Sequence, residues 1–161
     1  YTSSVNTGDS STRSFQPVER ELVFDIDMDD YNEVLNFTLD EHGWAKCWSL
    51  MAVAIQVLDK GLREDFGFEH VFFVFSGRRG IHCWVCDKRA RHLTDEQRSS
   101  IASYFSIYRG IEAGRAKLML TVPRHPSVQR ALEILEPIFV DHVLAQQEIL
   151  EREESWEKVL Q

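Results

Sequence analysis

The chain has 161 residues, of which 43% are hydrophobic and 27% are charged, and 26 acidic against 18 basic residues leave a net charge of −8. This size and composition fit one globular domain and argue against collagen-like, disordered and repeat architectures. Every apolar run falls well short of the roughly 18 residues that a membrane span needs, so we expect no association with a membrane.

The first residues carry little structural signal. Residues 1–18 are rich in Ser and Thr, begin with Tyr, and lack an apolar period. We interpret them as a flexible N-terminal segment or a cut end, and residues 19–161 as the folded part. The chain has three cysteines, which cannot all pair with one another, and this favours a reducing, intracellular compartment.

A strand and a helix are predicted next. From Glu21 to Met28 the sequence alternates, which places Val23, Asp25 and Asp27 on one face and apolar residues on the other. The pattern predicts a strand with a buried side and an acidic side. Lys46 to Arg63 carries apolar residues at the spacing of an amphipathic helix.

A hairpin follows this helix. His70–Phe75 and Ile81–Cys86 are two apolar runs rich in residues that favour strands. They are joined by the five-residue segment Ser76–Gly80, which contains two glycines. Two short strands with a glycine-rich connection of this length predict a β-hairpin.

Two more helices are predicted downstream. Thr94 followed by Gln97 forms a capping box before apolar residues at helical spacing. A third helical pattern runs from Ser127, with Pro126 suited to the first turn and Pro137 able to kink the middle. Its acidic continuation, residues 146–157, is expected to be solvated. The element order predicts an α/β (α+β) domain in which helices cover one side of a small mixed sheet.

Asp25 and Asp27 are the first candidate site residues. Two carboxylates on one strand face lie roughly 6 to 7 Å apart and repel each other unless a cation lies between them. Their hard oxygen atoms suit Mg²⁺ or Mn²⁺. The alternative is a half-exposed strand with an acidic polar face, and the pattern leaves both open. Asp29 and Asp30 fall where the strand ends, so we assign them to a turn.

The loop of the hairpin is the second candidate. It places Arg78 and Arg79 between two glycines, and His82 follows on the returning strand. Glycine lets backbone amides approach a ligand closely, and arginine offers a planar fork to phosphate oxygens. A solvent-exposed turn is the alternative. An acidic strand together with a basic loop indicates a site for a metal-bound nucleoside triphosphate.

The remaining cysteines and aromatic residues favour core packing. Cys83 and Cys86 fall on opposite faces of a strand and cannot easily hold one metal ion. Trp48, Trp84 and the segment 72–75 are interpreted as core residues, although aromatics beside a basic loop can also stack on bases. The segment 78–98 is locally basic, with six Lys or Arg against three acidic residues.

The stretch ELVFDIDMDDY, followed about fifty residues later by FSGRRGIHCWVCDKRAR, resembles the catalytic small subunit of eukaryotic and archaeal DNA primases. The resemblance extends from about Glu21 to the end of the chain. It implies a primase catalytic core with an RRM-like sheet flanked by helices, and it makes residues 19–161 part of that domain. It also implies that Asp25 and Asp27 are catalytic and ligate Mg²⁺ or Mn²⁺. The positions that would bind the nucleotide triphosphate are Ser76, Arg78, Arg79 and His82.

The resemblance also implies an activity and partners. The expected reaction is synthesis of short RNA primers on a single-stranded DNA template from nucleoside triphosphates during DNA replication. The expected partners are the primase large subunit and the DNA polymerase α complex, in the nucleus. The family's third metal-binding aspartate lies farther downstream, so we interpret the chain as a central fragment of the catalytic core that is not expected to be active alone.

The stretch after the acidic strand departs from the family. Eukaryotic members carry a four-cysteine zinc site there, and the matching positions are Phe37, Thr38, Trp44 and Cys47. Zinc is not expected, because one thiolate does not hold it. We expect Phe37 and Trp44 to pack in a small apolar cluster with Leu35 and Leu39, leaving Cys47 as a free thiol. A disordered loop is the competing interpretation.

Two other functions stay open at this stage. The chain is a non-catalytic assembly module of the primase complex if it docks the large subunit without polymerising. A glycosyltransferase is the less favoured alternative, because a pair of aspartates of this spacing also suits a metal-bound nucleotide sugar.

Overall fold

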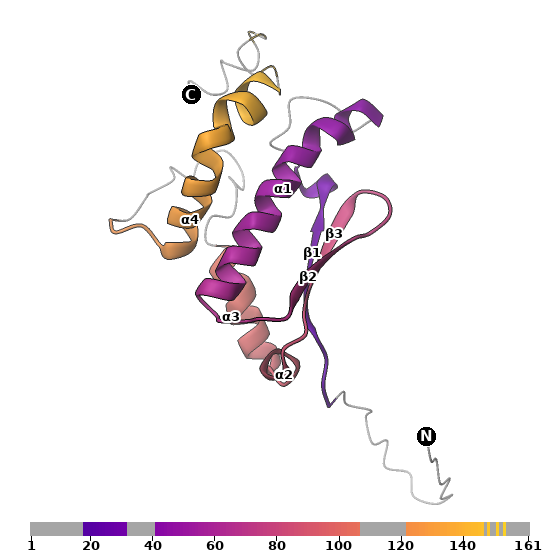
Figure 1. Ribbon diagram of the computed structural model, residues 1–161, viewed down its shortest axis with the longest axis vertical. Coiled ribbons are helices and arrows are strands. Elements are labelled where there is room, and N and C mark those ends of the chain that lie inside the picture. Colours follow the sequence, from indigo (N-terminus) through magenta and orange to yellow (C-terminus); the bar gives the residue numbers. More distant parts are fainter. Residues whose placement is uncertain are drawn as a thin grey trace, which may run out of the picture.

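The computed structural model describes residues 18–31, 41–106 and 122–146, together with residues 148, 151 and 153. Figure 1 shows a small sheet with the helices gathered on one side of it. The helices and strands, in chain order, are β1 (Leu22–Asp27), α1 (Glu41–Glu64), β2 (Val71–Phe75), β3 (Gly80–Val85), α2 (Lys88–Arg91), α3 (Asp95–Phe105) and α4 (Pro126–Leu135). None of these helices combines the length and the apolar character that crossing a bilayer requires.

The sheet has the strand order β1-β3-β2, and both pairings are antiparallel. The expected mixed sheet is therefore corrected within the described residues, which contain no parallel pair. The predicted hairpin is confirmed as β2 and β3. In the register between β1 and β3, Asp25 lies opposite His82 and Asp27 lies opposite Gly80. This register brings the acidic strand beside the residues that flank the basic loop.

The alternation in β1 produces one buried face and one open face, as the sequence predicts. Leu22 is 5% exposed and packs with Leu58 and Leu62 of α1, whereas Val23 on the opposite face is 42% exposed. A second cluster joins the end of β1 to the N-terminal half of α1 through Met28, Cys47, Met51 and Ile81. Apolar burial of this kind is the main contribution to folding, and it fixes which face of β1 carries the aspartates.

The predicted helices are present with different bounds. α1 begins at Glu41 rather than Lys46, and both hydrogen bonds of the Thr94 capping box are formed at the start of α3. Pro126 occupies the first turn of α4, as expected. The α-helical part ends at Leu135, and a 3₁₀ turn (Glu136–Ile138) and a π-helical segment (Phe139–Ala145) follow. A proline inside a helix removes a backbone donor, which explains the change at Pro137.

The acidic continuation after α4 is not purely solvated. Glu148 accepts a hydrogen bond from Lys46 Nζ at 3.1 Å, and Ser49 Oγ donates to Gln146 Oε1 at 3.0 Å. Both contacts reach back to α1 across about a hundred residues of sequence. They help to hold the segment after α4 against the first helix.

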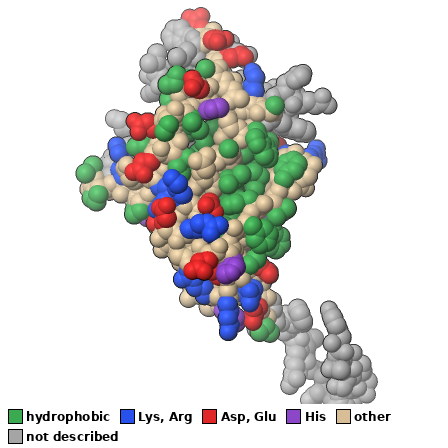
Figure 2. All heavy atoms as spheres, viewed as in Figure 1, with side chains coloured by type: hydrophobic (Ala, Val, Ile, Leu, Met, Phe, Trp, Pro, Cys, Tyr) green, Lys and Arg blue, Asp and Glu red, His purple; other side chains and the backbone are tan. Residues whose placement is uncertain are grey.

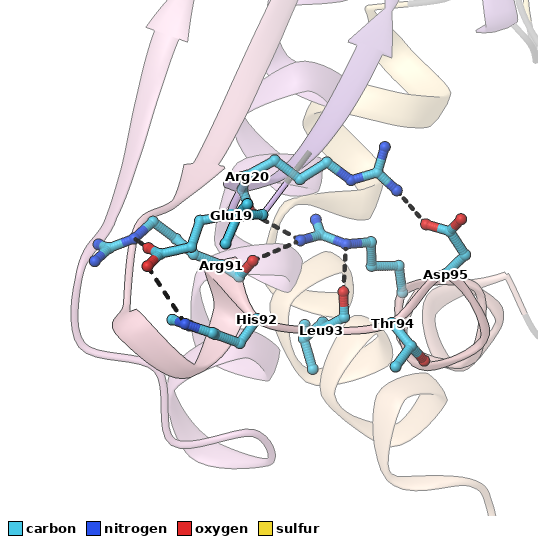
Figure 3. Close-up of a pocket in the computed structure, with 9 residues that line it drawn as sticks. Glu19, Arg20, Arg91, His92, Leu93, Thr94 and Asp95 are labelled. Atoms are coloured by element: carbon cyan, nitrogen blue, oxygen red, sulfur yellow. Dashed lines mark hydrogen bonds and ion pairs between the residues drawn. The ribbon is translucent and has the colours of Figure 1, made fainter. Parts of the chain in front are cut away.

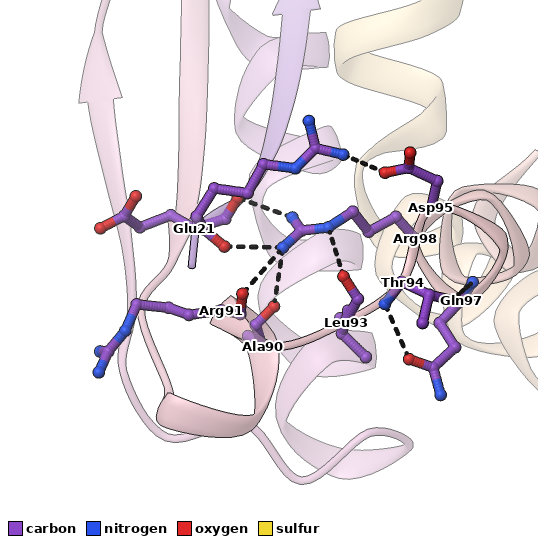
Figure 4. Close-up of polar contacts among 9 residues, drawn as sticks. Glu21, Ala90, Arg91, Leu93, Thr94, Asp95, Gln97 and Arg98 are labelled. Carbon is purple, nitrogen blue, oxygen red and sulfur yellow. Dashed lines mark hydrogen bonds and ion pairs between the residues drawn. The ribbon is translucent and has the colours of Figure 1, made fainter. Parts of the chain in front are cut away.

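A single arginine fixes the start of β1. The Arg98 guanidinium donates to the backbone carbonyls of Glu21 at 2.8 Å, Arg20 at 2.7 Å and Leu93 at 3.1 Å, and it also reaches Ala90 at 3.2 Å (Figure 4). Hydrogen bonds from a charged donor are among the stronger ones in proteins. Arg98 therefore ties the chain that enters β1 to α2 and to the loop that follows α2.

The same region contains a hollow lined by residues 18–20, 91–95 and Arg98 (Figure 3). Its polar side chains are paired with one another. Arg91 Nε lies 2.9 Å from Glu19, which also lies 3.4 Å from His92, and Arg20 pairs with Asp95. The basic residues of segment 78–98 therefore have different roles. Arg91 and Arg98 make structural contacts in this region. Arg78 and Arg79 lie in the loop between β2 and β3.

Several aromatic residues assigned to the core are exposed, which corrects that expectation. Phe72 is 50% exposed, Phe75 is 52% exposed and Trp48 is 43% exposed. Figure 2 shows hydrophobic side chains gathered over the strands beside α1. Phe73, between two of these residues, packs against both core clusters. Phe72 lies on the outer face of β2, whereas Phe75 shares the face of Phe73 at the end of the strand and contacts Trp48. The sequence pattern identifies the strand correctly but does not report how far other elements cover each face.

Candidate active site

The acidic residues of the candidate site lie on the open face of β1. Asp25 has 73% of its side chain exposed and Asp27 has 37%. Their positions two residues apart on one strand place both carboxylates on the same face, as predicted. Oδ1 of Asp25 lies 3.5 Å from Nε2 of its cross-strand partner His82. The imidazole therefore stands beside the acidic pair.

The loop between β2 and β3 is closed by reciprocal hydrogen bonds. The Ser76 amide donates to the Gly80 carbonyl at 2.9 Å, and the Gly80 amide donates to Ser76 Oγ at 2.9 Å. Gly77 has a φ of +91°, a conformation that side chains disfavour. The Met28 amide donates to the Arg79 carbonyl at 3.0 Å, so the loop is also attached to the end of β1. Ser76 thus shapes the loop that carries the arginines.

Arg79 joins the loop to the acidic residues. Its Nε lies 3.3 Å from Oδ2 of Asp27, and its Nη1 lies 2.5 Å from Oδ2 of Asp29. The Asp29 amide donates to Oδ1 of Asp27 at 2.9 Å. The three side chains are 37 to 41% exposed, so the network lies at the surface of the site. Arg78 is exposed and makes no ion pair with the part of the chain that the structure describes.

The structure brings most of the predicted residues together at one end of the sheet. Asp25 lies beside His82, and Asp27 lies beside Arg79, in a loop whose geometry depends on Ser76. The contact that sequence reasoning missed is the one between Arg79 and Asp29. Asp29 lies in the 3₁₀ turn Met28–Tyr31, as its assignment to a turn predicts, but its side chain also binds the arginine.

The donor set suits a hard divalent cation. Asp25 and Asp27 offer carboxylate oxygens on one accessible face, and Mg²⁺ is often held by one or two carboxylates with substrate phosphates and water as further ligands. No group of three or more His, Cys, Asp or Glu residues with the geometry of a metal site occurs among the described residues. Asp25 and Asp27 thus offer two ligands of the kind that Mg²⁺ or Mn²⁺ takes, which is fewer than either ion needs to complete its coordination.

The segment where the family places zinc is only partly described. Residues 32–40 and the side chain of Trp44 lie outside the described residues, so the expected cluster of Phe37 and Trp44 stays a prediction. Cys47 is fully buried next to Met51, and burial raises the pKa of its thiol. Since zinc binds the thiolate, this surrounding favours an apolar role for Cys47.

Comparison with known proteins places these observations in a family. A family model described as DNA primase small subunit matches residues 24–161. The chain is 50% identical over 136 residues to the DNA primase small subunit of Drosophila melanogaster, with 83% of the chain covered. It is 44% identical over 149 residues to that of Schizosaccharomyces pombe and 45% identical over 130 residues to that of Saccharomyces cerevisiae, with 91% and 81% of the chain covered.

The chain spans about a third of the length of these relatives, since the matched regions cover 31%, 33% and 32% of them. The family match begins at residue 24, within β1, and includes the hairpin, so it contains every residue of the candidate site. The sequence similarity thus extends over the acidic strand and the basic loop, whose contacts are described above.

Proposed function

The chain belongs to the DNA primase small subunit family, and on this premise we propose that it forms the nucleotide-binding part of a DNA primase catalytic subunit. The complete subunit would synthesise short RNA primers on single-stranded DNA from nucleoside triphosphates. The observation that carries this proposal is the contact between the acidic strand and the basic loop. Arg79 Nε lies 3.3 Å from Asp27, so the carboxylate proposed to bind metal and the cation proposed to bind phosphate are neighbours, which supports a shared site.

The proposed role of Asp25 and Asp27 is to ligate Mg²⁺ or Mn²⁺. A divalent cation held there supplies Lewis-acid stabilisation of the charge that develops on the α-phosphate and helps to orient the attacking 3′-hydroxyl. His82 lies 3.5 Å from Asp25, where its ring nitrogen is able to donate to a phosphate oxygen. We assign His82 to triphosphate binding on this basis.

The proposed role of the loop is to hold the triphosphate and the leaving pyrophosphate. Arg78 and Arg79 supply positive charge and N–H donors, and Ser76 keeps the loop closed while its own hydroxyl hydrogen is available to a phosphate oxygen. Charges placed in advance near the developing negative charge stabilise the transition state without reorganising during the reaction.

The proposed partners follow from the family and stay proposals for this chain. They are a primase large subunit, the DNA polymerase α complex, and a single-stranded DNA template with its RNA primer. The proposed location is the nucleus. The exposed Phe72 and Phe75 provide apolar area on the sheet for contacts with other parts of the assembly.

Primer synthesis by the complete small subunit tests the proposed function. Wild-type protein should extend a primer on single-stranded template with Mg²⁺ or Mn²⁺, and the Asp25→Asn and Asp27→Asn variants should not. Wild-type-like synthesis by Asp27→Asn would overturn the assignment. A subunit that binds its large partner normally but fails to synthesise primers under all metal conditions would support the non-catalytic assembly module instead.

A further inference from the structure

Asp29 occupies a position that the proposed chemistry does not use. It is the third aspartate in the i, i+2 series that begins with Asp25, but it lies beyond the strand in a 3₁₀ turn. Its carboxylate approaches Nη1 of Arg79 to 2.5 Å, which is closer than the 3.3 Å between Arg79 Nε and Asp27. The tighter of the two carboxylate contacts of Arg79 is therefore the one with Asp29.

We propose that Asp29 is a positioning residue that holds the Arg79 guanidinium beside the metal-binding carboxylates, ready to bind the triphosphate. This inference rests on the proposed function. An arginine has five N–H donors, and the two carboxylates face only Nε and Nη1. The two N–H donors of Nη2 stay available for phosphate oxygens while Asp29 holds Nη1 of the same guanidinium.

Electrostatics explains why a second carboxylate is needed. When the oxygens of Asp27 ligate a divalent cation, they attract Arg79 less, and the positive charges of cation and guanidinium repel each other. Arg79 is 37% exposed and would then extend into solvent unless another group held it. The Asp29 carboxylate offsets this repulsion, and its backbone amide, which donates to Asp27 at 2.9 Å, ties the two acidic residues together.

The neighbouring Asp30 provides a matched control. Asp30 is exposed and makes no ion pair within the described ranges, and it lies in the same turn as Asp29. Replacing either residue by Asn removes one negative charge near the site. Through general electrostatics alone, both changes would strengthen binding of an anion or leave it unchanged. If Asp29 positions Arg79, the Asp29→Asn change should instead weaken anion binding, and the Asp30→Asn change should not.

The test is a calorimetric titration of the complete small subunit with ATP and Mg²⁺ at low ionic strength. We expect Asp29→Asn to weaken binding by about three- to tenfold, within the range measured for coupled neighbouring charges. Asp30→Asn should bind ATP at least as well as wild type. The titration is repeated with inorganic tripolyphosphate without divalent cation, where Arg79 and the other phosphate-binding residues act without any contribution from a metal ion.

A double-mutant cycle with Arg79→Ala completes the test. In the Arg79→Ala background, Asp29→Asn should cause no further loss, because it acts only through the arginine. A loss of equal size in that background, or equal behaviour of Asp29→Asn and Asp30→Asn, would overturn the inference. A loss caused by misfolding would persist in the Arg79→Ala background and is thereby recognised. If Arg79→Ala itself binds ATP like wild type, the phosphate-binding role of the loop fails, and with it the proposed function.

Discussion

Asp25 and His82 are direct cross-strand neighbours, with Oδ1 and Nε2 separated by 3.5 Å on the open face of the sheet. The next pair on the same face of this ladder, beyond Ile26 and Ile81, is Asp27 and Gly80, and Gly80 begins the returning strand after the basic loop. Two neighbouring pairs on one face of the sheet therefore connect the proposed metal ligands to the proposed phosphate-binding residues. The antiparallel pairing of β1 and β3 is what makes these residues one site.

Removing either of the proposed metal ligands should abolish activity but preserve the fold. Asp25→Asn and Asp27→Asn in the complete subunit should lower the primer synthesis rate by about a hundredfold or more, since metal-ion stabilisation contributes several kcal/mol. Asn keeps an oxygen acceptor for the Asp29 amide, so the melting temperature should stay close to that of wild type. A gel-based extension assay and thermal unfolding measure the two quantities.

Truncating Arg78 should affect nucleotide binding more than stability. Arg78 is exposed and makes no ion pair with other described residues, whereas each charge-assisted phosphate contact contributes about 1.5 to 3 kcal/mol. We expect Arg78→Ala to raise the apparent KM for the nucleotide about tenfold or more. Steady-state kinetics and chemical denaturation separate the effects. An unchanged KM with a lower unfolding free energy would mean that the arginine is structural.

Arg98 should contribute strongly to stability. Replacing it by Met removes the donor for several backbone carbonyls, and we expect the free energy of unfolding to fall by about 2 to 3 kcal/mol. Arg20→Ala is the control, because Arg20 makes an exposed ion pair with Asp95 and should cost less than about 1 kcal/mol. Urea unfolding of both variants measures the difference, and equal losses would contradict the role of Arg98.

The ion pair between Asp65, which directly follows α1, and Arg130 of α4 should make the free energy of unfolding depend on pH in the acidic range. The Arg130 guanidinium holds the pKa of Asp65 below its usual range, through hydrogen bonds of 2.5 and 2.8 Å, and Tyr104 donates to the same carboxylate at 2.7 Å. A depressed pKa in the folded state contributes stability above the unfolded pKa of about 3.9, and this contribution is lost as the pH falls through the folded pKa.

Asp65→Asn should therefore lower the unfolding free energy at pH 7 and make its decline below about pH 4 shallower than in wild type. Asp59→Asn is the matched control, since Asp59 makes a surface pair with Arg63 on the same helix and should cost less than about 1 kcal/mol. Urea unfolding at a series of pH values measures both. Parallel pH profiles for Asp65→Asn and wild type would contradict the assignment.

The zinc content of the protein tests our interpretation of residues 37–47, the segment that matches the zinc site of eukaryotic family members. We expect less than one zinc per chain by elemental analysis, and a melting temperature that a chelator does not change. A buried Cys47 beside Met51 agrees with an apolar role. A stoichiometric zinc signal would mean that the residue-by-residue matching of positions 37–47 to the family is wrong.

Periodicity predicted the strands, the hairpin and the starts of α3 and α4, because burial of one face and local capping are encoded by nearby residues. It did not predict that Phe72 and Phe75 are exposed, since a strand pattern does not report how far neighbouring elements cover each face. Phe72 lies on the outer face of β2, and Phe75 lies at the end of the strand on the face of Phe73, beside the half-exposed Trp48. The contact between Asp29 and Arg79 was also missed. It depends on how a 3₁₀ turn and a hairpin loop from distant parts of the sequence meet, and no local pattern reports that.

The register of β1 against β3 also limits which insertions and deletions the family can tolerate here. Side chains alternate along a strand, so one residue inserted before Asp25 within β1 would turn both aspartates toward Leu58 and Leu62 of the core. One residue inserted after Gly77 would leave the strands paired but would move Arg79 away from Asp27 and Asp29. Length changes should therefore be absent from both β1 and the loop, and an alignment of natural sequences would show its gaps outside these two segments.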